Sequence, residues 1–466
     1  MTIRTLAGSS LVLALGAGSV PAQQSSRATL TARIDSLAGA FIADTHTPAV
    51  SVAVLRGTDT LVMKGYGDAS IDSHRAATAS TVYRIGSITK QFTSAAIMQL
   101  IERGKLSLDD PMSKYLPDVP LHGHTVTIRQ LLNHTSGIHS YTSEPEWQKT
   151  WGEDLTPRQI VAFVDKDTFD FAPGTAWRYD NTGYVLLGMI IEKVTGEPYA
   201  KYLQHDLFAP LGLRQTSYCP SRPTDPSFAD GYSSAGGTVK PAAFLSMTHP
   251  FSAGALCSTV RDLVIWQRAL AGGRVVNAKS FALMTTADTL NNGKRLNYGF
   301  GLVPGMLGTH RSIGHGGGVN GFTTSSIFFP DDSVNVVVFS NSDRGPDPLA
   351  LNIARAVFGM PLVAAPKPLV AVPLPDADRD RLPGIYDLIT PGGGKFVIHI
   401  MVENGQLMTQ AEGPGQGKFP LVYLGNLQFG ATFDPSLRVT FISENGAITK
   451  MRLEQGGGTM EGARRP

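Results

Sequence analysis

The chain has 466 residues, of which 42% are hydrophobic and 17% are charged. This composition is typical of a globular protein with a sizeable core, and the length allows two or three domains. The formal net charge is +2 and no basic cluster is present, which argues against a nucleic-acid-binding protein.

The N-terminal segment has the features of a secretory signal peptide. Arg4 supplies a positive charge, the following stretch to Val20 is apolar or small, and Val20-Pro21-Ala22 fits a cleavage site. We therefore expect residues 1–22 to be removed and the protein to be exported, either periplasmic or secreted. The alternative is a membrane anchor, but the apolar run is short for a span. No later stretch is long enough to cross a bilayer, so we expect no integral membrane segment after removal.

The next segments alternate between helix and strand patterns. Apolar residues recur at helical spacing over 25–43, and two strands at 49–55 and 60–63 flank a tight turn. The stretch Arg84-Ile85-Gly86-Ser87-Ile88-Thr89-Lys90 then opens a further run of helical spacing. It predicts a helix from about Ser87 to Arg103, with Ser87 in its first turn and Lys90 on the same face.

The S-x-x-K spacing of Ser87 and Lys90 suits nucleophilic catalysis. A serine hydroxyl is a weak nucleophile until a nearby base takes its proton. A lysine can be that base when burial or a helix N-terminus lowers its pKa. The helix start also presents backbone N–H groups to a developing oxyanion. Because two fixed letters occur by chance, the interpretation depends on partner motifs elsewhere in the chain.

Residues 106–271 have mainly helical patterns. We expect helices near 106–117, 127–134, 157–171, 185–193, 199–207 and 259–271. Residues 220–252 are rich in Pro, Ser and Gly, which indicates a long surface excursion beside a cleft. Within residues 131–137 we expect Gly137 to cap a helix and His134 to bond locally, without a catalytic role.

Strand patterns return at 311–315, 322–329 and 334–340, followed by a helix at 347–358. Strands at both ends with helices between them predict an α/β fold. Its antiparallel sheet would be closed by the two ends, flanked by helices, and interrupted by an inserted all-helical region. We expect this domain to occupy residues 23–360.

The remaining residues, 361–466, differ from the preceding domain in composition and in their predicted elements. Residues 361–380 are proline-rich and are expected to form a linker. Residues 381–454 contain apolar runs joined by Asn-Gly turns, which predicts a small all-β, barrel-like domain. The Gly-rich tail, 455–466, is expected to be disordered.

The chain has two cysteines, Cys219 and Cys257. Export permits a disulfide between them, and two buried free thiols are the alternative. No spacing of cysteines and histidines suggests zinc, so we expect no metal and no organic cofactor.

Two motifs join Ser87 and Lys90. Tyr179-Asp180-Asn181 is the only Y-x-N in the chain, and His315-Gly316-Gly317 the only H-G-G. Their order is a variant of the S-x-x-K, S-D-N and K-T-G set. Over about residues 30–360 the chain therefore resembles the serine β-lactamase and penicillin-binding protein family, on the side of class C β-lactamases, DD-peptidases and esterases. Residues 131–137 and 258–263 are part of the resemblance.

The resemblance implies a role for each side chain. Ser87 would be the nucleophile, Lys90 its proton acceptor or relay, and Tyr179 the general base and later acid. Asn181 would orient Lys90 and the substrate amide. Because a tyrosine titrates near pH ~10 unless cations lower its pKa, a charged Lys90 would stabilise a Tyr179 phenolate.

The same resemblance places His315 on a strand edge beside the substrate. The backbone N–H groups of Ser87 and Gly318 would form the oxyanion hole, and Gly316 and Gly317 would let the substrate lie against the strand. The familiar third motif begins with a lysine that binds a substrate carboxylate. A histidine is mostly neutral at pH 7, which weakens the case for β-lactamase or carboxypeptidase action. Relatives with histidine here include D-aminopeptidase-like hydrolases.

These features imply an exported serine hydrolase that acylates Ser87, a peptidase or amidase acting on small peptides, amides or esters, including D-residues. A carboxylesterase and a class C-like β-lactamase are the alternatives among enzymes. A penicillin-binding sensor without turnover and a structural envelope protein are alternatives of other classes. The segment from Leu382 resembles the lipocalin-like domain of some related peptidases, where it covers the cleft or acts as a spacer. The oligomeric state stays open.

Overall fold

The computed structural model describes most of the chain. The residues described are 20–166, 169–234, 238–363, 369, 371–389, 395–403, 405–412, 418–431, 434–455 and 458–466. The expected signal peptide lies largely outside these residues, as does part of the expected linker. None of the helices in the described segments combines the length and apolar character needed to traverse a bilayer.

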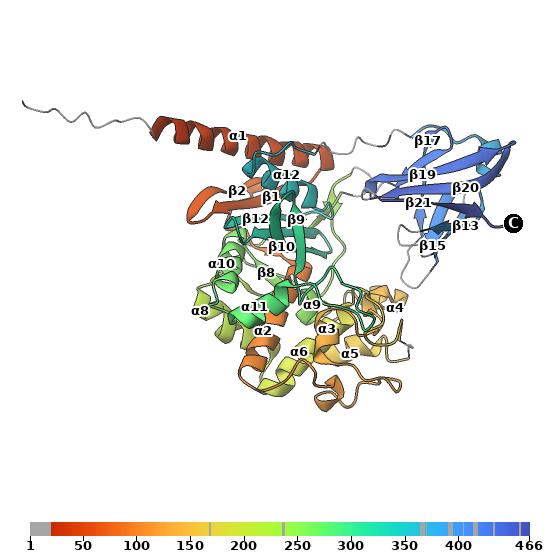
Figure 1. The fold of residues 1–466 in the computed structure, drawn as a ribbon. Helices are drawn as coiled ribbons and strands as arrows, with labels where there is room; N and C mark the ends of the chain where they lie inside the picture. The colour runs from red at the N-terminus through yellow and green to blue at the C-terminus, as the bar shows by residue number, and fades with distance from the viewer. Residues whose placement is uncertain are drawn as a thin grey trace, which may run out of the picture. The chain divides into compact units, whose positions relative to one another are not determined.

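The chain divides into two compact units, Met1–Leu362 and Val363–Pro466. The first is built on a seven-stranded antiparallel sheet with the order β3-β2-β1-β12-β11-β10-β9 (Figure 1). Its strands are β1 (Ala49–Arg56), β2 (Asp59–Ser70), β3 (Arg75–Ala76), β9 (Val303–Leu307), β10 (His310–Val319), β11 (Phe322–Phe329) and β12 (Val334–Ser340).

The central pair of this sheet joins the two ends of the unit. β1 runs antiparallel to β12, with Val52 opposite Val338. The expected closure of one sheet by the two ends is therefore confirmed. Both strands are buried on both faces, so they are apolar nearly throughout, and alternate residues enter different cores.

Two helices cover one face of the sheet, α1 (Val20–Thr45) and α12 (Asp347–Val357) (Figure 1). The core between them and the sheet contains Ile34, Ala38, Val50, Val52, Val54, Val336, Val338, Leu349 and Ile353. The opposite face packs on the inserted helical region through Ala53, Val337 and Phe339, which belong to a larger core.

The inserted region is all-helical apart from two small sheets. Its helices are η1 (Gly86–Ile88), α2 (Thr89–Glu102), η2 (Met112–Lys114), α3 (Ile128–Leu132), η3 (Tyr141–Ser143), α4 (Pro145–Lys149), α5 (Pro157–Ala162), α6 (Asn181–Thr195), α7 (Tyr199–Leu203), η4 (Gln204–Phe208), α8 (Ala209–Leu211), α9 (Phe251–Gly254), α10 (Val260–Ala271) and α11 (Ala278–Thr285). The small sheets contain β4 (Tyr83–Arg84), β8 (Leu256–Ser258) and β5 (Ser217–Tyr218), and β6 (Tyr232–Ser233) with β7 (Lys240–Pro241).

Helix α2 lies at the centre of this region and is buried over most of its length. Phe92 stacks on Trp266 of α10 at a ring-centroid distance of 3.9 Å. The expected helix at 157–171 is shorter than predicted. It ends at Ala162, because the chain turns there and brings Val164 back into the core beside Ile160 and Val161.

The second unit is a nearly closed, barrel-like antiparallel sheet with the order β16-β15-β14-β13-β21-β20-β19-β18-β17. Its strands are β13 (Gly384–Ile389), β14 (Lys395–Glu403), β15 (Gln406–Ala411), β16 (Phe419–Pro420), β17 (Val422–Gly425), β18 (Gln428–Ala431), β19 (Asp434–Glu444), β20 (Ala447–Gln455) and β21 (Gly458–Arg464), preceded by α13 (Asp376–Arg379). It has its own core around Tyr386, Phe429, Phe441 and Met451.

The C-terminal tail was expected to be disordered, and this prediction is wrong. Residues 458–464 form β21, which pairs with both β13 and β20. Gly462 permits the pairing of β21 with β13, because a Cβ at this position would lie 1.7 Å from the Asp387 carbonyl oxygen. Glycine here reflects close backbone approach in a strand and does not indicate disorder.

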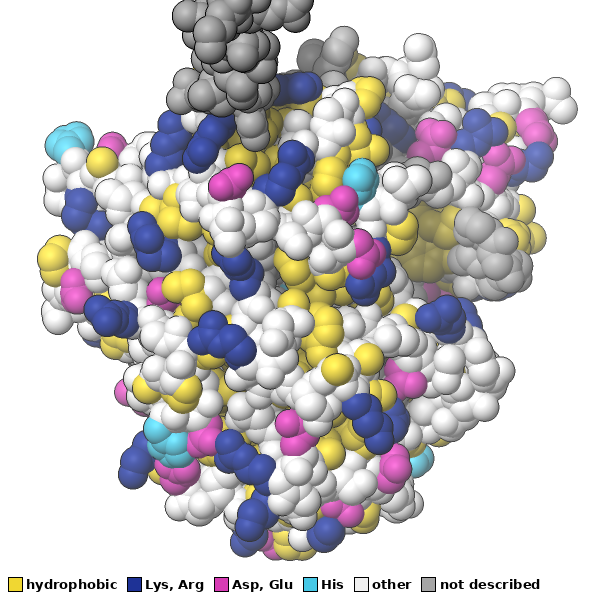
Figure 2. Space-filling model, turned by 60° about the vertical axis from the view of Figure 1, so that its left-hand side comes forward, with side chains coloured by type: hydrophobic (Ala, Val, Ile, Leu, Met, Phe, Trp, Pro, Cys, Tyr) yellow, Lys and Arg dark blue, Asp and Glu magenta, His cyan; other side chains and the backbone are white. Residues whose placement is uncertain are grey.

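The surface carries charges of both signs. On the face in Figure 2, Lys and Arg side chains are interspersed with Asp and Glu. This distribution fits the small net charge of the chain.

Candidate active site

Ser87 lies in η1, the single 3₁₀ turn that leads into α2. Gly86, which precedes it, has a φ of +51°, and a Cβ there would lie 2.6 Å from the backbone nitrogen of Gly318. Only glycine satisfies both the backbone conformation and this close approach. The turn carrying Ser87 therefore lies directly against β10, the strand that carries the H-G-G motif.

Two glycines of β10, Gly317 and Gly318, differ in how closely their neighbours approach them. A Cβ at Gly317 would lie 2.0 Å from the Ile85 carbonyl oxygen, to which the Thr324 hydroxyl also donates at 3.0 Å. A Cβ at Gly318 would meet nothing within 4 Å. Gly317 is thus required for packing of the strand on the Ser87 turn, whereas the strand is open at Gly318.

Lys90 is fully buried and faces three oxygen atoms. Its Nζ lies 3.2 Å from Ser87 Oγ, 2.8 Å from Asn181 Oδ1 and 2.9 Å from the carbonyl oxygen of Ala253. Burial lowers the pKa of Lys90 to about 7, although the carboxyl group of Asp180 acts in the opposite direction. Near neutral pH a substantial fraction of this amine is therefore uncharged.

The Y-x-N motif lies at the start of α6. Asp180 is the N-cap of this helix, and its Oδ2 accepts from the Gly183 N–H at 2.9 Å. Asn181 donates through Nδ2 to Thr142 Oγ1 at 3.2 Å, which turns its Oδ1 toward Lys90. By capping α6, Asp180 fixes the backbone of its two neighbours, Tyr179 and Asn181. The side chains of both neighbours contact Lys90.

Tyr179 packs over the lysine, with its ring centroid 4.7 Å from Lys90 Nζ. Its hydroxyl is buried and has no hydrogen-bond partner among the described residues. Burial raises the pKa of Tyr179, and the nearby Ser87 hydroxyl lowers it by less. The expected phenolate is therefore not favoured in the free protein, because burial and the nearby Asp180 carboxyl group both raise the pKa of Tyr179.

His315 has both ring nitrogens engaged. Its Nδ1 donates to the Gly316 carbonyl oxygen at 2.5 Å, so Nε2 accepts from the Tyr298 hydroxyl at 2.8 Å. Burial lowers the pKa of His315 to about 4. The side chain is therefore neutral at pH 7.

Sequence reasoning missed Tyr298 and misjudged His134. Tyr298 lies in the connection between α11 and β9, where no motif marks it. The expectation that His134 bonds locally is wrong. Its Nδ1 accepts from the backbone N–H of Asp180, 46 residues away, at 3.1 Å, and its ring packs on Tyr179. Its place in the 131–137 stretch was the available signal.

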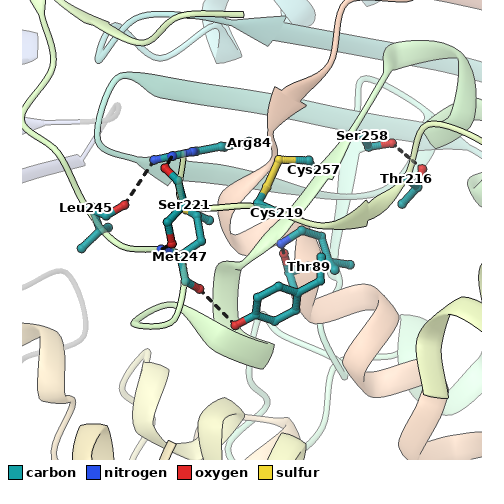
Figure 3. The surroundings of a disulfide bond; sticks show 11 residues. Arg84, Thr89, Thr216, Cys219, Ser221, Leu245, Met247, Cys257 and Ser258 are labelled. Atoms are coloured by element: carbon teal, nitrogen blue, oxygen red, sulfur yellow. Dashed lines mark hydrogen bonds between the residues drawn. A yellow bond between two sulfur atoms is a disulfide. The ribbon is translucent and has the colours of Figure 1, made fainter. Parts of the chain in front are cut away.

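Cys219 and Cys257 form a disulfide near Arg84 and Thr89, two residues on either side of the Ser87 turn (Figure 3). Cys257 lies in β8, opposite Arg84 of β4 and Ser217 of β5. The preceding strand residue, Leu256, donates its N–H to Thr89 Oγ1 at the start of α2. The disulfide thus joins the two ends of the segment that contains residues 220–252 and connects it to the strand before Ser87. The expected surface excursion is only partly correct, because residues from Leu245 to Ser252 are mostly buried.

Within the described segments one cluster brings potential metal ligands together, Glu197, His205 and Asp206. His205 already bonds to Glu197, and Arg103 pairs with Asp206 at 2.6 Å. A guanidinium in this position disfavours a cation.

Comparison with known proteins agrees with this geometry. Residues 34–359 match the family described as Beta-lactamase. Penicillin-binding protein 4* of Bacillus subtilis is 29% identical over 320 residues, covering 63% of this chain and 68% of that protein. The octameric penicillin-binding protein homologue from Pyrococcus abyssi is 25% identical, with a TM-score of 0.65 over 92% of this chain and 99% of that chain.

A D-stereospecific amidohydrolase from Streptomyces sp. is 31% identical, with a TM-score of 0.61 over 72% of this chain and 99% of that chain. The family match spans most of the chain and includes Ser87, Lys90, Tyr179 and His315. This protein therefore belongs to the Beta-lactamase family and is a serine hydrolase.

Proposed function

We propose that the protein is an exported hydrolase that forms an acyl-enzyme on Ser87 and cleaves small amides and peptides, including those with D-residues. The observation that carries the proposal is the set of partners around Lys90. Two of them, Asn181 Oδ1 and the Ala253 carbonyl, can only accept hydrogen bonds. A neutral amine has two N–H groups for these acceptors, which leaves its lone pair facing the Ser87 hydroxyl 3.2 Å away.

Acylation follows from this arrangement. The neutral Lys90 amine takes the Ser87 proton as Oγ attacks the substrate carbonyl carbon. The carbonyl π electrons move to oxygen, and the backbone N–H groups of Ser87 and Gly318 hold the oxyanion. When the carbonyl re-forms, the bond to the leaving nitrogen breaks and an acyl-Ser87 ester remains.

Tyr179 is the proposed proton donor to the leaving nitrogen. Its hydroxyl is buried beside Ser87 and has no hydrogen-bond partner of good geometry among the described residues, so it is available to a substrate group. A phenol with a raised pKa holds its proton in the free enzyme and can pass it to an amine as the C–N bond breaks. The Tyr179 proton is then replaced from Lys90, whose ammonium results from the first step. Water hydrolyses the ester by the reverse sequence of proton transfers.

Because His315 is neutral, it cannot bind a substrate carboxylate next to β10. This favours amide substrates that carry no carboxylate at that position. Its Nε2 accepts from Tyr298 and its Nδ1 donates to Gly316, so neither nitrogen offers a proton to an anion. The similarity to a D-stereospecific amidohydrolase supports the same class and the inclusion of D-residues.

The test compares D-aminoacyl amides, p-nitrophenyl esters and a chromogenic cephalosporin, with intact-mass spectrometry of the protein after each. We expect turnover of the amides, and an adduct that maps to Ser87. Ser87→Ala should abolish both while leaving the melting temperature nearly unchanged. A folded Ser87→Ala variant at full rate would refute the proposal, and an adduct that persists for hours without turnover would favour a sensor. N-terminal sequencing of the secreted protein tests export, with Gln23 as the expected first residue.

A further inference from the structure

His134 accepts hydrogen bonds from the backbone N–H groups of the residues on both sides of Tyr179. Its carbonyl oxygen accepts from the Arg178 N–H at 3.1 Å, and its ring Nδ1 accepts from the Asp180 N–H at 3.1 Å. The residue before Tyr179 and the residue after it are thus held by one and the same histidine.

The imidazole ring also packs on the Tyr179 side chain. The ring centroids of His134 and Tyr179 are 4.4 Å apart, and those of Tyr298 and Tyr184 lie at 4.7 Å and 5.1 Å. His134 is 1% exposed, so this aromatic cluster excludes water from the inner side of the Tyr179 ring.

The hydrogen-bonding state of His134 is fixed by these contacts. Since Nδ1 accepts from Asp180, the ring proton is on Nε2, which is buried without a partner among the described residues. Burial also lowers the pKa of His134 well below its ordinary value of 6.5, and the positive charge of Lys90 adds to this. The ring is therefore neutral at pH 7. It acts through Nδ1, which accepts a hydrogen bond, and through the ring face that packs on Tyr179.

The backbone of His134 is strained. Its φ is +63°, in the left-handed region, directly after the C-cap of α3. Glycine or asparagine is the usual residue at such a position. A larger side chain there is destabilising and persists only where the surroundings hold it.

We propose that His134 is a positioning residue of the hydrolase, which holds Tyr179 from three directions so that its hydroxyl stays beside Ser87 and its ring stays over Lys90. The inference rests on the proposed role of Tyr179 as proton donor to the leaving group. His134 does not touch the reacting atoms; it acts through the peptide groups that flank Tyr179 and through the face of its ring.

The test uses the leaving group of the substrate. A p-nitrophenolate leaves without a proton, whereas the nitrogen of an amide requires one from Tyr179. Misplacement of Tyr179 therefore slows amide hydrolysis selectively, while a general loss of structure slows both reactions. His134→Phe keeps a ring and removes the acceptor, and His134→Asn keeps an acceptor on a side chain that tolerates the left-handed backbone.

We expect His134→Phe to lower kcat for a D-phenylalanine amide by about 10- to 100-fold with little change in KM, since small displacements of catalytic groups have effects of this size. Acylation by a p-nitrophenyl ester should change by less than about threefold, as expected for a step that bypasses Tyr179. His134→Asn should recover part of the amide rate.

A double variant completes the design. Adding His134→Phe to Tyr179→Phe should cause no further loss on the amide, because the two residues act through one hydroxyl. Equal losses on amide and ester in His134→Phe, or additive losses in the double variant, would overturn the positioning role. If Tyr179→Phe alone affects amide and ester equally, the proposed role of Tyr179 fails instead. The two failures are therefore distinguishable.

Discussion

At the scale of single residues, the protonation of Lys90 determines how the reaction depends on pH. Its pKa is lowered to about 7, and only the neutral amine can accept the Ser87 proton. We expect kcat/KM for an amide to rise with pH through a midpoint near this value, because the lysine is charged below it. A pH–rate profile between about pH 5 and 9 tests this. A midpoint near 4 would instead point to His315.

A neighbouring carboxyl group provides the control for that assignment. Burial raises the pKa of Asp180 to about 7, so it titrates in the same range, and its negative charge raises the pKa of Lys90. Asp180→Asn removes this charge and retains an oxygen to cap α6. The midpoint should then move to lower pH. An unchanged profile would mean that neither member of the pair controls the rate.

At the scale of elements, the contact between β10 and the Ser87 turn depends on one glycine. An alanine Cβ at position 317 would lie 2.0 Å from the Ile85 carbonyl oxygen, so one of the two segments must shift. We expect Gly317→Ala to destabilise the first unit by about 1–3 kcal/mol, the usual cost of overpacking. Gly318→Ala is the matched control, because its Cβ meets nothing within 4 Å.

Thermal unfolding of the two glycine variants gives the comparison. Gly318→Ala should melt within a degree or two of the unchanged protein, because surface substitutions change the free energy of unfolding by only about 0.5 kcal/mol. Equal melting temperatures for both variants would contradict the close approach of β10 to Ile85.

The disulfide acts at the same scale. Cys219 and Cys257 are 38 residues apart in sequence, and closing a loop of that length reduces the unfolded-state entropy by the equivalent of roughly 4 kcal/mol. Cys219→Ser/Cys257→Ser should lower the free energy of unfolding of the first unit by an amount of this order. Urea unfolding measures it, with reducing agent as control. Reductant should destabilise the unchanged protein and not the variant; a variant of unchanged stability would exclude a structural disulfide.

The sequence predicted those elements that carry a local pattern. The helix that follows Ser87 and the strand at His315 each have such a pattern, and so does closure of the sheet by β1 and β12. The helix expected at 185–193 begins earlier, at Asn181, because Asp180 caps it through the Gly183 N–H. Tyr298 and His134 could not be assigned, because their contacts in the site depend on packing between segments that are distant in sequence. The C-terminal strand β21 was missed because glycine indicates both disorder and close packing.

At the scale of the whole molecule, each unit contains a complete core. Among the described residues, the apolar cores of the first unit reach as far as Met360, and the core of the second starts with Leu374. The catalytic side chains and α12, which covers the sheet, all belong to the first unit. The first unit therefore has what it needs to fold without the second.

We expect a protein ending at Leu362 to unfold cooperatively and to acylate Ser87 with a small ester at the rate of the full chain. Its rate on longer peptides then separates the two roles considered for the second unit. An unchanged rate indicates a spacer, since a module that does not narrow the site cannot discriminate by substrate length. A higher rate on long peptides, with the small ester unaffected, indicates a cover over the cleft. Aggregation of the shortened protein, or loss of its cooperative transition, would contradict the independence of its core.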